Sequence, residues 1–232
     1  MEKIKIYYDG TELKDFYENP NVVGFTTNIS FLKQAKITNY GAFIEDSLKY
    51  AKGRPISFQL YDDEDEEIKK TARKIASYGE NIFVKIPIIK TSEEPNVEVI
   101  KQLHEDGLKI NITAIFTMEQ VSSLKNCFNK TTPAIISLFA GRVNDSGTDC
   151  SNLVKYACEL FNDYPNVEIL WAACRTVYNM FEAERQGADI VTVPGSVISR
   201  MNRIGDDHHE ASVAQVKSFR NDGILGNIKF IN

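Results

Sequence analysis

The stretch NIFVKIPII, residues 81–89, is a short apolar run with one charged residue, Lys85, near its centre. Its apolar residues do not alternate with polar ones, which is typical of a strand buried on both faces, as in a parallel sheet covered by helices. Burying an ammonium costs free energy, because the charge loses its hydration. A lysine at this position therefore indicates either a structural ion pair or an amine with a chemical role.

Seven further runs of this kind recur along the chain, separated by segments with a helical pattern. Eight strands alternating with helices in 232 residues predict one (β/α)8 barrel of the TIM type, a single domain of residues 1–232. A doubly wound open sheet is the alternative, although the first strand-to-helix turn, YDGTELKDF, has no GxGxxG pattern. The predicted strands are residues 4–9, 22–28, 55–61, 82–87, 109–116, 134–141, 168–174 and 189–195.

Three helical segments carry signals at their ends. Residues 62–79 open with an acidic run and close at Gly79, which suits a helix dipole and a C-cap; the acidic run is a solvated first turn or, alternatively, a metal site. Thr117, followed three residues later by Gln120, predicts a capping box. Residues 208–227 predict a last helix and a short extension beyond the barrel, in which His208 and His209 face solvent.

The composition argues against several classes of protein. A formal net charge of −5 disfavours a main role in binding nucleic acid or an anionic membrane. The chain has no apolar run of about 18 residues and no apolar core near its N-terminus, so we expect neither a transmembrane helix nor a signal peptide. We expect no metal site, and reduced thiols in a cytoplasmic protein, because no ligand spacing or CxxC pair occurs among Cys127, Cys150, Cys158 and Cys174.

Polar residues gather at the carboxyl ends of the predicted strands. In a (β/α)8 barrel these ends form the mouth in which active sites are built. Any one of these residues alone could be a buried polar group with a structural partner, but their convergence predicts a site. They are Asp9, Thr26, Thr27, Asn28, Gln59, Lys85, Asn111, Thr113, Ser137, Arg142 and Arg175.

Lys85 is the most informative of these residues. Burial lowers the pKa of a lysine and so frees its amine as a nucleophile toward a carbonyl. The alternative is a structural ion pair with Asp9. Arg142 and Arg175 are candidates for bidentate phosphate binding, or else ordinary surface residues.

The sequence resembles the small transaldolases, a group that includes fructose-6-phosphate aldolase and transaldolase-like proteins of bacterial sugar and polysaccharide gene clusters. The resemblance covers nearly the whole chain in order, each match at an expected strand. The combination of GFTTN, VKIP and FAGR is its most specific part. The matching stretches are YYDGT, VVGFTTNIS, PISFQLY, FVKIPIIKT, INITAIFT, ISLFAGRVND and ILWAACRT.

The resemblance implies a (β/α)8 barrel and class I chemistry without a metal or cofactor. Lys85 matches the lysine that forms a Schiff base with a ketose, so that the C3–C4 bond breaks and a dihydroxyacetone unit passes to an aldose acceptor. Asp9 matches the aspartate that handles the proton of the C4 hydroxyl, and Thr113 the threonine that positions a water. The resemblance places Thr27, Asn28, Asn111, Ser137 and Phe139 at the substrate, and Arg142 and Arg175 at the acceptor phosphate.

Several positions depart from the family pattern, among them Ile29 in place of a proline and the stretch NDSG at residues 144–147. Three further departures fall at the expected site. Gln59 stands where transaldolases have a proton-handling glutamate, and Phe139 where the fructose-6-phosphate aldolases have a tyrosine. Ala173 replaces a serine of the phosphate site. General acid–base assistance is typically worth about 10²–10⁴-fold in rate, so these changes leave open a slow or redirected reaction.

Three functions therefore stay open. The first is a transaldolase of the pentose phosphate type, with a fructose-6-phosphate aldolase as its close variant. The second is the same imine chemistry on an unusual sugar, and the third is a sugar-phosphate-binding relative with weakened catalysis. In each case the expected partners are small sugar phosphates and further copies of the chain, as a pentamer or decamer by analogy.

Overall fold

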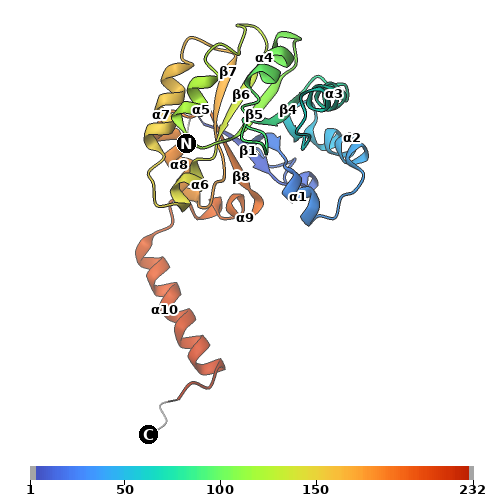
Figure 1. Ribbon diagram of the computed structural model, residues 1–232. Helices are drawn as coiled ribbons and strands as arrows, with labels where there is room; N and C mark the ends of the chain where they lie inside the picture. Colours follow the sequence, from blue (N-terminus) through green and yellow to red (C-terminus); the bar gives the residue numbers. More distant parts are fainter. Residues whose placement is uncertain (1–3, 230–232) are drawn as a thin grey trace. The chain divides into compact units, whose positions relative to one another are not determined.

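The computed structural model describes residues 4–229. Its eight strands are all parallel and close into a barrel in the order β1 to β8, because β1 also pairs with β8. Figure 1 shows the strands in the centre and helices around them. The predicted (β/α)8 barrel is confirmed, and the alternative of an open sheet is wrong.

The strands begin and end close to the predicted positions. Each pairs in register with its two neighbours, which brings all eight carboxyl ends to one mouth. The strands are β1 Lys5–Asp9, β2 Val22–Thr26, β3 Ile56–Gln59, β4 Ile82–Pro87, β5 Ile110–Ile115, β6 Ala134–Leu138, β7 Val167–Trp171 and β8 Ile190–Pro194.

A helix or a pair of helices follows each strand after β1, and each of these helices has buried residues on one part of its surface. Their bounds are α1 Ile29–Gln34, α2 Tyr40–Ala51, α3 Asp65–Ala76, α4 Val97–Glu105, α5 Met118–Ser123, α6 Ala140–Asp145, α7 Ser151–Leu160, α8 Val177–Gln186 and α9 Gly195–Ile198. A short 3₁₀ turn, η1 Leu13–Asp15, follows β1.

Four predicted strands stop early, β2 and β3 by two residues and β6 and β7 by three. The chain leaves β6 at Leu138 and starts α6 two residues later, where the Gly141 amide donates to the carbonyl of Ala172. A Cβ on Gly141 would lie 1.9 Å from the carbonyl oxygen of Ala173, so only glycine allows this approach. After β7, Ala173 adopts a φ of 64°, which ends the extended backbone.

The predicted helix ends have mixed outcomes. The capping box of Thr117 and Gln120 is confirmed at α5. The predicted C-cap at Gly79 is wrong, because α3 ends at Ala76 and its C-cap is Ser77 in right-handed geometry.

The lower part of the barrel interior is filled by apolar side chains, which we call the apolar layer. Tyr7 is the largest of them, and a Cβ on Gly24 would lie 2.5 Å from its ring, so this glycine makes room for it. The layer consists of Tyr7, Phe83, Ile135, Leu170, Ala172 and Ile190.

Contacts divide the chain into two compact units, one ending at Ile198 and one beginning at Ser199. The second unit contains the 3₁₀ turn η2 Met201–Arg203 and the helix α10 His208–Leu225, which is capped by the side chain of Asp207. No residue of α10 is buried, and its histidines are exposed as predicted.

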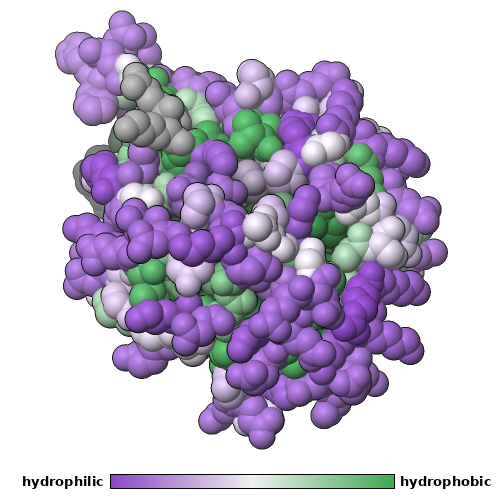
Figure 2. Space-filling model, turned by 90° about the horizontal axis from the view of Figure 1, so that it is seen from above, coloured by the Kyte–Doolittle hydropathy of each residue, from purple (hydrophilic) through white to green (hydrophobic). Residues whose placement is uncertain are grey.

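The molecular face drawn in Figure 2 is mostly hydrophilic, with separate apolar patches. Among residues 4–229, no helix is long and apolar enough to cross a membrane. The same residues contain no cluster of three or more side chains suited to a metal ion.

Candidate active site

A second layer of side chains lies above the apolar layer, toward the mouth, and is polar. On four strands a polar residue follows the apolar one by two positions, which keeps it on the inner face. Tyr7 is followed by Asp9, Phe83 by Lys85, Ile135 by Ser137 and Ile190 by Thr192. We call this the polar layer; its members are Asp9, Thr26, Ser57, Gln59, Lys85, Asn111, Thr113, Ser137 and Thr192.

Lys85 lies in the polar layer with only 5% of its surface exposed. Its Nζ donates to the carbonyl oxygen of Thr27 at 3.4 Å, and it forms no ion pair with any carboxylate of the described residues. Burial lowers the pKa of Lys85, and the nearby charge of Asp9 opposes the shift. The amine is thus weakly bound and favoured in its neutral, nucleophilic form.

Asp9 ends β1 and faces the same interior. The hydroxyl of Thr26 donates to Asp9 Oδ1 at 2.7 Å and shares a second hydrogen bond with the hydroxyl of Thr192. Burial raises the pKa of Asp9, opposed by the charge of Lys85 and by this hydrogen bond. Sequence reasoning missed Thr192, although the alternation within DIVTVPG placed it on the inner face.

Three side chains on adjacent strands form a hydrogen-bonded chain across the polar layer. Asn111 Nδ2 donates to Ser57 Oγ at 2.9 Å, and Ser137 Oγ donates to Asn111 Oδ1 at 2.7 Å. All three are at most 1% exposed, so this network fixes the orientation of the Asn111 amide. Ser57 was not among the predicted site residues; its position two residues before Gln59 was the available signal.

Thr113 has the one buried hydroxyl of the polar layer that lacks a hydrogen-bond partner among the described residues. It lies on β5, opposite Pro87 and two residues beyond Asn111, the register partner of Lys85. Buried hydroxyls are almost always satisfied, so an unpaired one at a barrel mouth suits a water or a ligand.

Gln59 is the direct neighbour of Lys85 in the strand register. Its backbone carbonyl accepts a hydrogen bond from the Tyr40 hydroxyl at 2.8 Å, whereas its side chain forms none with the described residues. A carboxamide neither gives nor takes a proton near neutral pH, so Gln59 offers hydrogen bonds alone.

Three predicted binding residues are engaged in structural contacts. The hydroxyl of Thr27 donates to the carbonyl of Ser57 at 3.0 Å, so Thr27 contributes its backbone oxygen to Lys85. Asn28 Oδ1 accepts from the amide of Phe31 at 3.0 Å and caps α1. Phe139 is half-buried and packs against the apolar layer, which it covers at the end of β6.

Arg142 and Arg175 lie at the ends of neighbouring strands, and both are exposed. Arg175 forms an ion pair of 3.0 Å with Asp145, at the end of α6. The close approach of Gly141 to the carbonyl of Ala173 joins the two segments that carry the arginines. The structure therefore brings these two predicted residues to one edge of the mouth.

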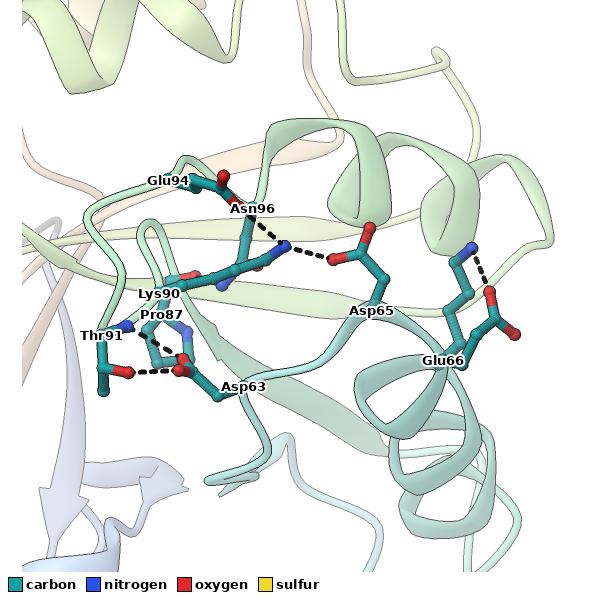
Figure 3. Close-up of polar contacts among 9 residues, drawn as sticks. Asp63, Asp65, Glu66, Pro87, Lys90, Thr91, Glu94 and Asn96 are labelled. Atoms are coloured by element: carbon teal, nitrogen blue, oxygen red, sulfur yellow. Dashed lines mark hydrogen bonds and ion pairs between the residues drawn. The ribbon is translucent and has the colours of Figure 1, made fainter.

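The loops that follow β3 and β4 are joined by polar contacts, which we call the loop clamp (Figure 3). Asp63 accepts from the backbone amide of Thr91 at 2.9 Å and from its hydroxyl. Lys90 pairs with Asp65 at 2.6 Å and with Glu94 at 3.7 Å. Carboxylates of the predicted solvated turn thus bind the neighbouring loop, directly above the strands of Gln59 and Lys85.

Comparison with known proteins shows which family the chain belongs to. The sequence profile of the Transaldolase/Fructose-6-phosphate aldolase family matches residues 6–225. The chain belongs to this family. The match confirms the resemblance carried by the strand motifs, and it indicates an enzyme of the aldolase and transaldolase type.

Individual relatives are similar over most of their length. A protein named "Probable transaldolase" from Nitrosopumilus maritimus (strain SCM1) is 29% identical over 203 residues, 85% of this chain and 87% of the relative. One of the same name from Caldicellulosiruptor saccharolyticus (strain ATCC 43494 / DSM 8903 / Tp8T 6331) is 30% identical over 195 residues, 83% of this chain and 85% of the relative.

Among solved structures, the HpcH/HpaI aldolase from Desulfitobacterium hafniense DCB-2 resembles this chain with a TM-score of 0.55 and 11% sequence identity. The match covers 99% of this chain and 95% of that one. At this identity the likeness shows the barrel fold alone.

Proposed function

We propose that this member of the transaldolase family is a class I transaldolase, which moves a dihydroxyacetone unit from a ketose phosphate to an aldose acceptor through an imine at Lys85. The observation that carries the proposal is the state of Lys85, an almost fully buried amine with one weak hydrogen bond and a lowered pKa. A structural lysine would pair with Asp9, and no such ion pair forms among the described residues.

The polar layer supplies the groups that this reaction needs. The protonated imine draws electrons from the C3–C4 bond, which is the task that a metal ion performs in other aldolases. Asp9 accepts the proton of the C4 hydroxyl as the bond breaks, and the network of Asn111 and Ser137 holds the hydroxyls of the dihydroxyacetone unit. The unpaired hydroxyl of Thr113 holds a water.

Trapping with borohydride tests the imine. Incubation with fructose 6-phosphate followed by reduction should add one triose to the chain, and peptide mass measurement should locate it on Lys85. Lys85→Met should carry no adduct. Lys90→Met is the matched control, because Lys90 belongs to the next loop and is paired with Asp65, so this variant should label as the wild type does. Absence of an adduct, or an adduct that survives Lys85→Met, contradicts the proposal.

An exchange assay separates the related activities. With fructose 6-phosphate and erythrose 4-phosphate, a transaldolase of the pentose phosphate type makes a seven-carbon ketose phosphate, whereas an aldolase releases free dihydroxyacetone. A relative that only binds sugar phosphates shows neither product. Phe139 favours the first outcome, since a tyrosine at this position accompanies the aldolase activity in the family resemblance.

The acceptor edge supports a second candidate, the same imine chemistry with an unphosphorylated sugar as acceptor. Arg175 already pairs with Asp145, and Ala173 offers no hydroxyl for a phosphate oxygen. A lost neutral hydrogen bond is worth about 1 kcal/mol. A panel of aldoses with and without phosphate decides between the two: exclusive use of phosphorylated acceptors rejects the second candidate.

We also propose that the full chain assembles into a ring-shaped oligomer, a pentamer or decamer, through the exposed apolar residues of α10. Val216, Phe219 and Ile224 are each more than 60% exposed within this helix. Exposed apolar groups of this size mark contact surfaces. Light scattering should give a multiple of the chain mass for the wild type and a smaller one for Phe219→Asp. A monomeric wild type rejects the assembly. The four free thiols suit a reducing, cytoplasmic setting.

A further inference from the structure

Asp9 is the one carboxylic acid in the polar layer of the described barrel. Thr26 binds its Oδ1, and no described residue donates a hydrogen bond to its Oδ2. The second oxygen is therefore available to a molecule held at Lys85. The charge of Lys85 lowers the pKa of Asp9, and the charge of Asp9 raises the pKa of Lys85, so the two groups interact electrostatically.

The neighbouring strand gives Lys85 no second acid. Gln59 lies beside Lys85 in the register, where a carboxyl would be in reach of the amine, and it carries an amide instead. The other members of the layer are hydroxyls and the amide of Asn111, which do not exchange protons readily near neutral pH. Formation of an imine nevertheless requires an acid, because the oxygen of the ketone leaves as water.

We propose that Asp9 serves both proton transfers at Lys85, first as the acid that completes the imine and then as the base that opens the C3–C4 bond. This inference rests on the proposed function and deepens it. It assigns to one carboxyl the two tasks that transaldolases divide between an aspartate and a glutamate.

The two steps balance. The neutral Lys85 amine forms a bond to the ketone carbon, and a proton moves from nitrogen to oxygen to give a carbinolamine. Asp9 donates its proton to the carbinolamine hydroxyl as the C–O bond breaks, which releases water and leaves a protonated imine and a carboxylate. The carboxylate then takes the proton of the C4 hydroxyl as the C3–C4 electrons move into the imine. An aldehyde leaves, the enamine remains, and Asp9 is again neutral.

The surroundings of the pair favour the protonation states that this cycle needs at its start. Burial raises the pKa of Asp9 toward the neutral acid and lowers the pKa of Lys85 toward the neutral amine. Lys85 Nζ donates to the carbonyl oxygen of Thr27 and not to Asp9, so the two groups are not locked together as an ion pair.

Dihydroxyacetone isolates the first step, because it has no C3–C4 bond and needs only an acid. The test measures the rate of borohydride trapping with dihydroxyacetone and, separately, cleavage of fructose 6-phosphate. We expect Asp9→Asn to slow trapping by about 10²–10⁴-fold. In Asp9→Asn/Gln59→Glu, trapping should recover and cleavage should stay lost. Asp189→Asn is the matched control, because Asp189 lies at the opposite end of the barrel, where it accepts the backbone amide of Ile169.

The outcomes separate the two proposals. A wild type that forms no adduct overturns the proposed function and this inference together. A wild type that forms the adduct, with Asp9→Asn trapping dihydroxyacetone at the same rate, overturns the inference alone. If Asp9→Asn does not fold, Gln59→Glu in the presence of Asp9 decides: we expect less than a tenfold gain in trapping, and a gain of a hundredfold or more would mean that the wild type lacks an acid at this step.

Discussion

The two layers of the barrel interior are built from the same strands and differ in what they do. The apolar layer, which contains Tyr7 and Phe83, is almost fully buried and packs through apolar contacts, with the Tyr7 hydroxyl as its one polar side-chain group. Two residues further along the same strands, Asp9 and Lys85 bring charge-bearing groups into the interior, where Lys85 is buried and Asp9 is partly exposed. Residues two positions apart on a strand point to the same face, so both layers face the barrel interior. The apolar layer stabilises the fold, and the polar layer supplies the reactive groups.

Hydrogen bonds within the polar layer explain why its burial does not destabilise the barrel. Most of its members satisfy one another, as in the chain of Ser57, Asn111 and Ser137, so their burial costs little. Lys85 and Thr113 do not find full partners, and Thr113 lies on β5 two residues beyond Asn111, the register partner of Lys85 on β4. Unpaired groups in a buried layer store free energy that a ligand can use.

The largest expected effect on stability comes from a substitution in the apolar layer. Phe83→Ala removes a buried aromatic side chain and should lower the free energy of unfolding by about 3–5 kcal/mol. Urea unfolding measures it. Tyr61→Ala is the matched control on the barrel surface, where Tyr61 is 75% exposed, and it should change stability by about 0.5 kcal/mol or less. Equal losses in the two variants would mean that the apolar layer does not carry the stability of the barrel.

A change in the polar layer should have the opposite sign. Lys85→Met keeps the length of the side chain and removes the buried amine, so the free energy of unfolding should rise by about 0.5–2 kcal/mol while the adduct is lost. The same urea titration measures it. A loss of stability comparable to that of Phe83→Ala would show Lys85 to be a structural residue and would erase the distinction between the layers.

The strand motifs were enough to predict the barrel and most of the polar layer, because parallel strands covered on both faces leave a strong signal in the sequence. Lys85, Asp9 and Asn111 were found in this way. Thr192 and Ser57 were missed because single small hydroxyl residues within apolar strands resemble ordinary packing residues.

Other features depended on contacts between distant segments. The early ends of β6 and β7 follow from the approach of Gly141 to Ala173, which no local pattern encodes. The loop clamp joins residues about 28 positions apart, so the acidic run in the sequence revealed a helix start and not its partners. Gly79 was predicted as the C-cap from its residue type, whereas the chain leaves α3 at Ala76 through tighter turns, in which the amides of Tyr78 and Gly79 donate to the carbonyls of Ile75 and Ala76.

A smaller effect on stability is expected from a buried titratable group outside both layers. His104 on α4 is fully buried, and neither ring nitrogen has a hydrogen-bond partner of normal geometry among the described residues. Burial lowers the pKa of His104 below its usual 6.5, opposed by backbone groups at Asn129 and Leu108.

The pH dependence of stability follows from this shift. Above about pH 6.5 neither the folded nor the unfolded state protonates His104, and stability is complete. As pH falls below that value the unfolded state takes up the proton first, so stability should decrease toward the lower folded pKa. Urea unfolding at pH 7.5 and 5.5 should show a smaller difference in His104→Leu than in the wild type. His208→Gln/His209→Gln, at exposed sites, should keep the wild-type difference; if it does not, the slope belongs to other groups.

The smallest effect concerns the rim above the polar layer, where the loop clamp joins exposed loops. The Asp63 carboxylate accepts the amide and hydroxyl of Thr91, and these bonds lower the pKa of Asp63. Asp63→Ala should leave global unfolding nearly unchanged, because exposed polar contacts contribute little to stability. Hydrogen exchange at the Thr91 amide should become faster, whereas exchange at the Lys90 amide, which donates to the carbonyl of Glu94 within its own loop, should change less. Equal acceleration at both amides would show that Asp63 holds the whole loop after β4. The loop would then open as one cooperative unit, and not contact by contact.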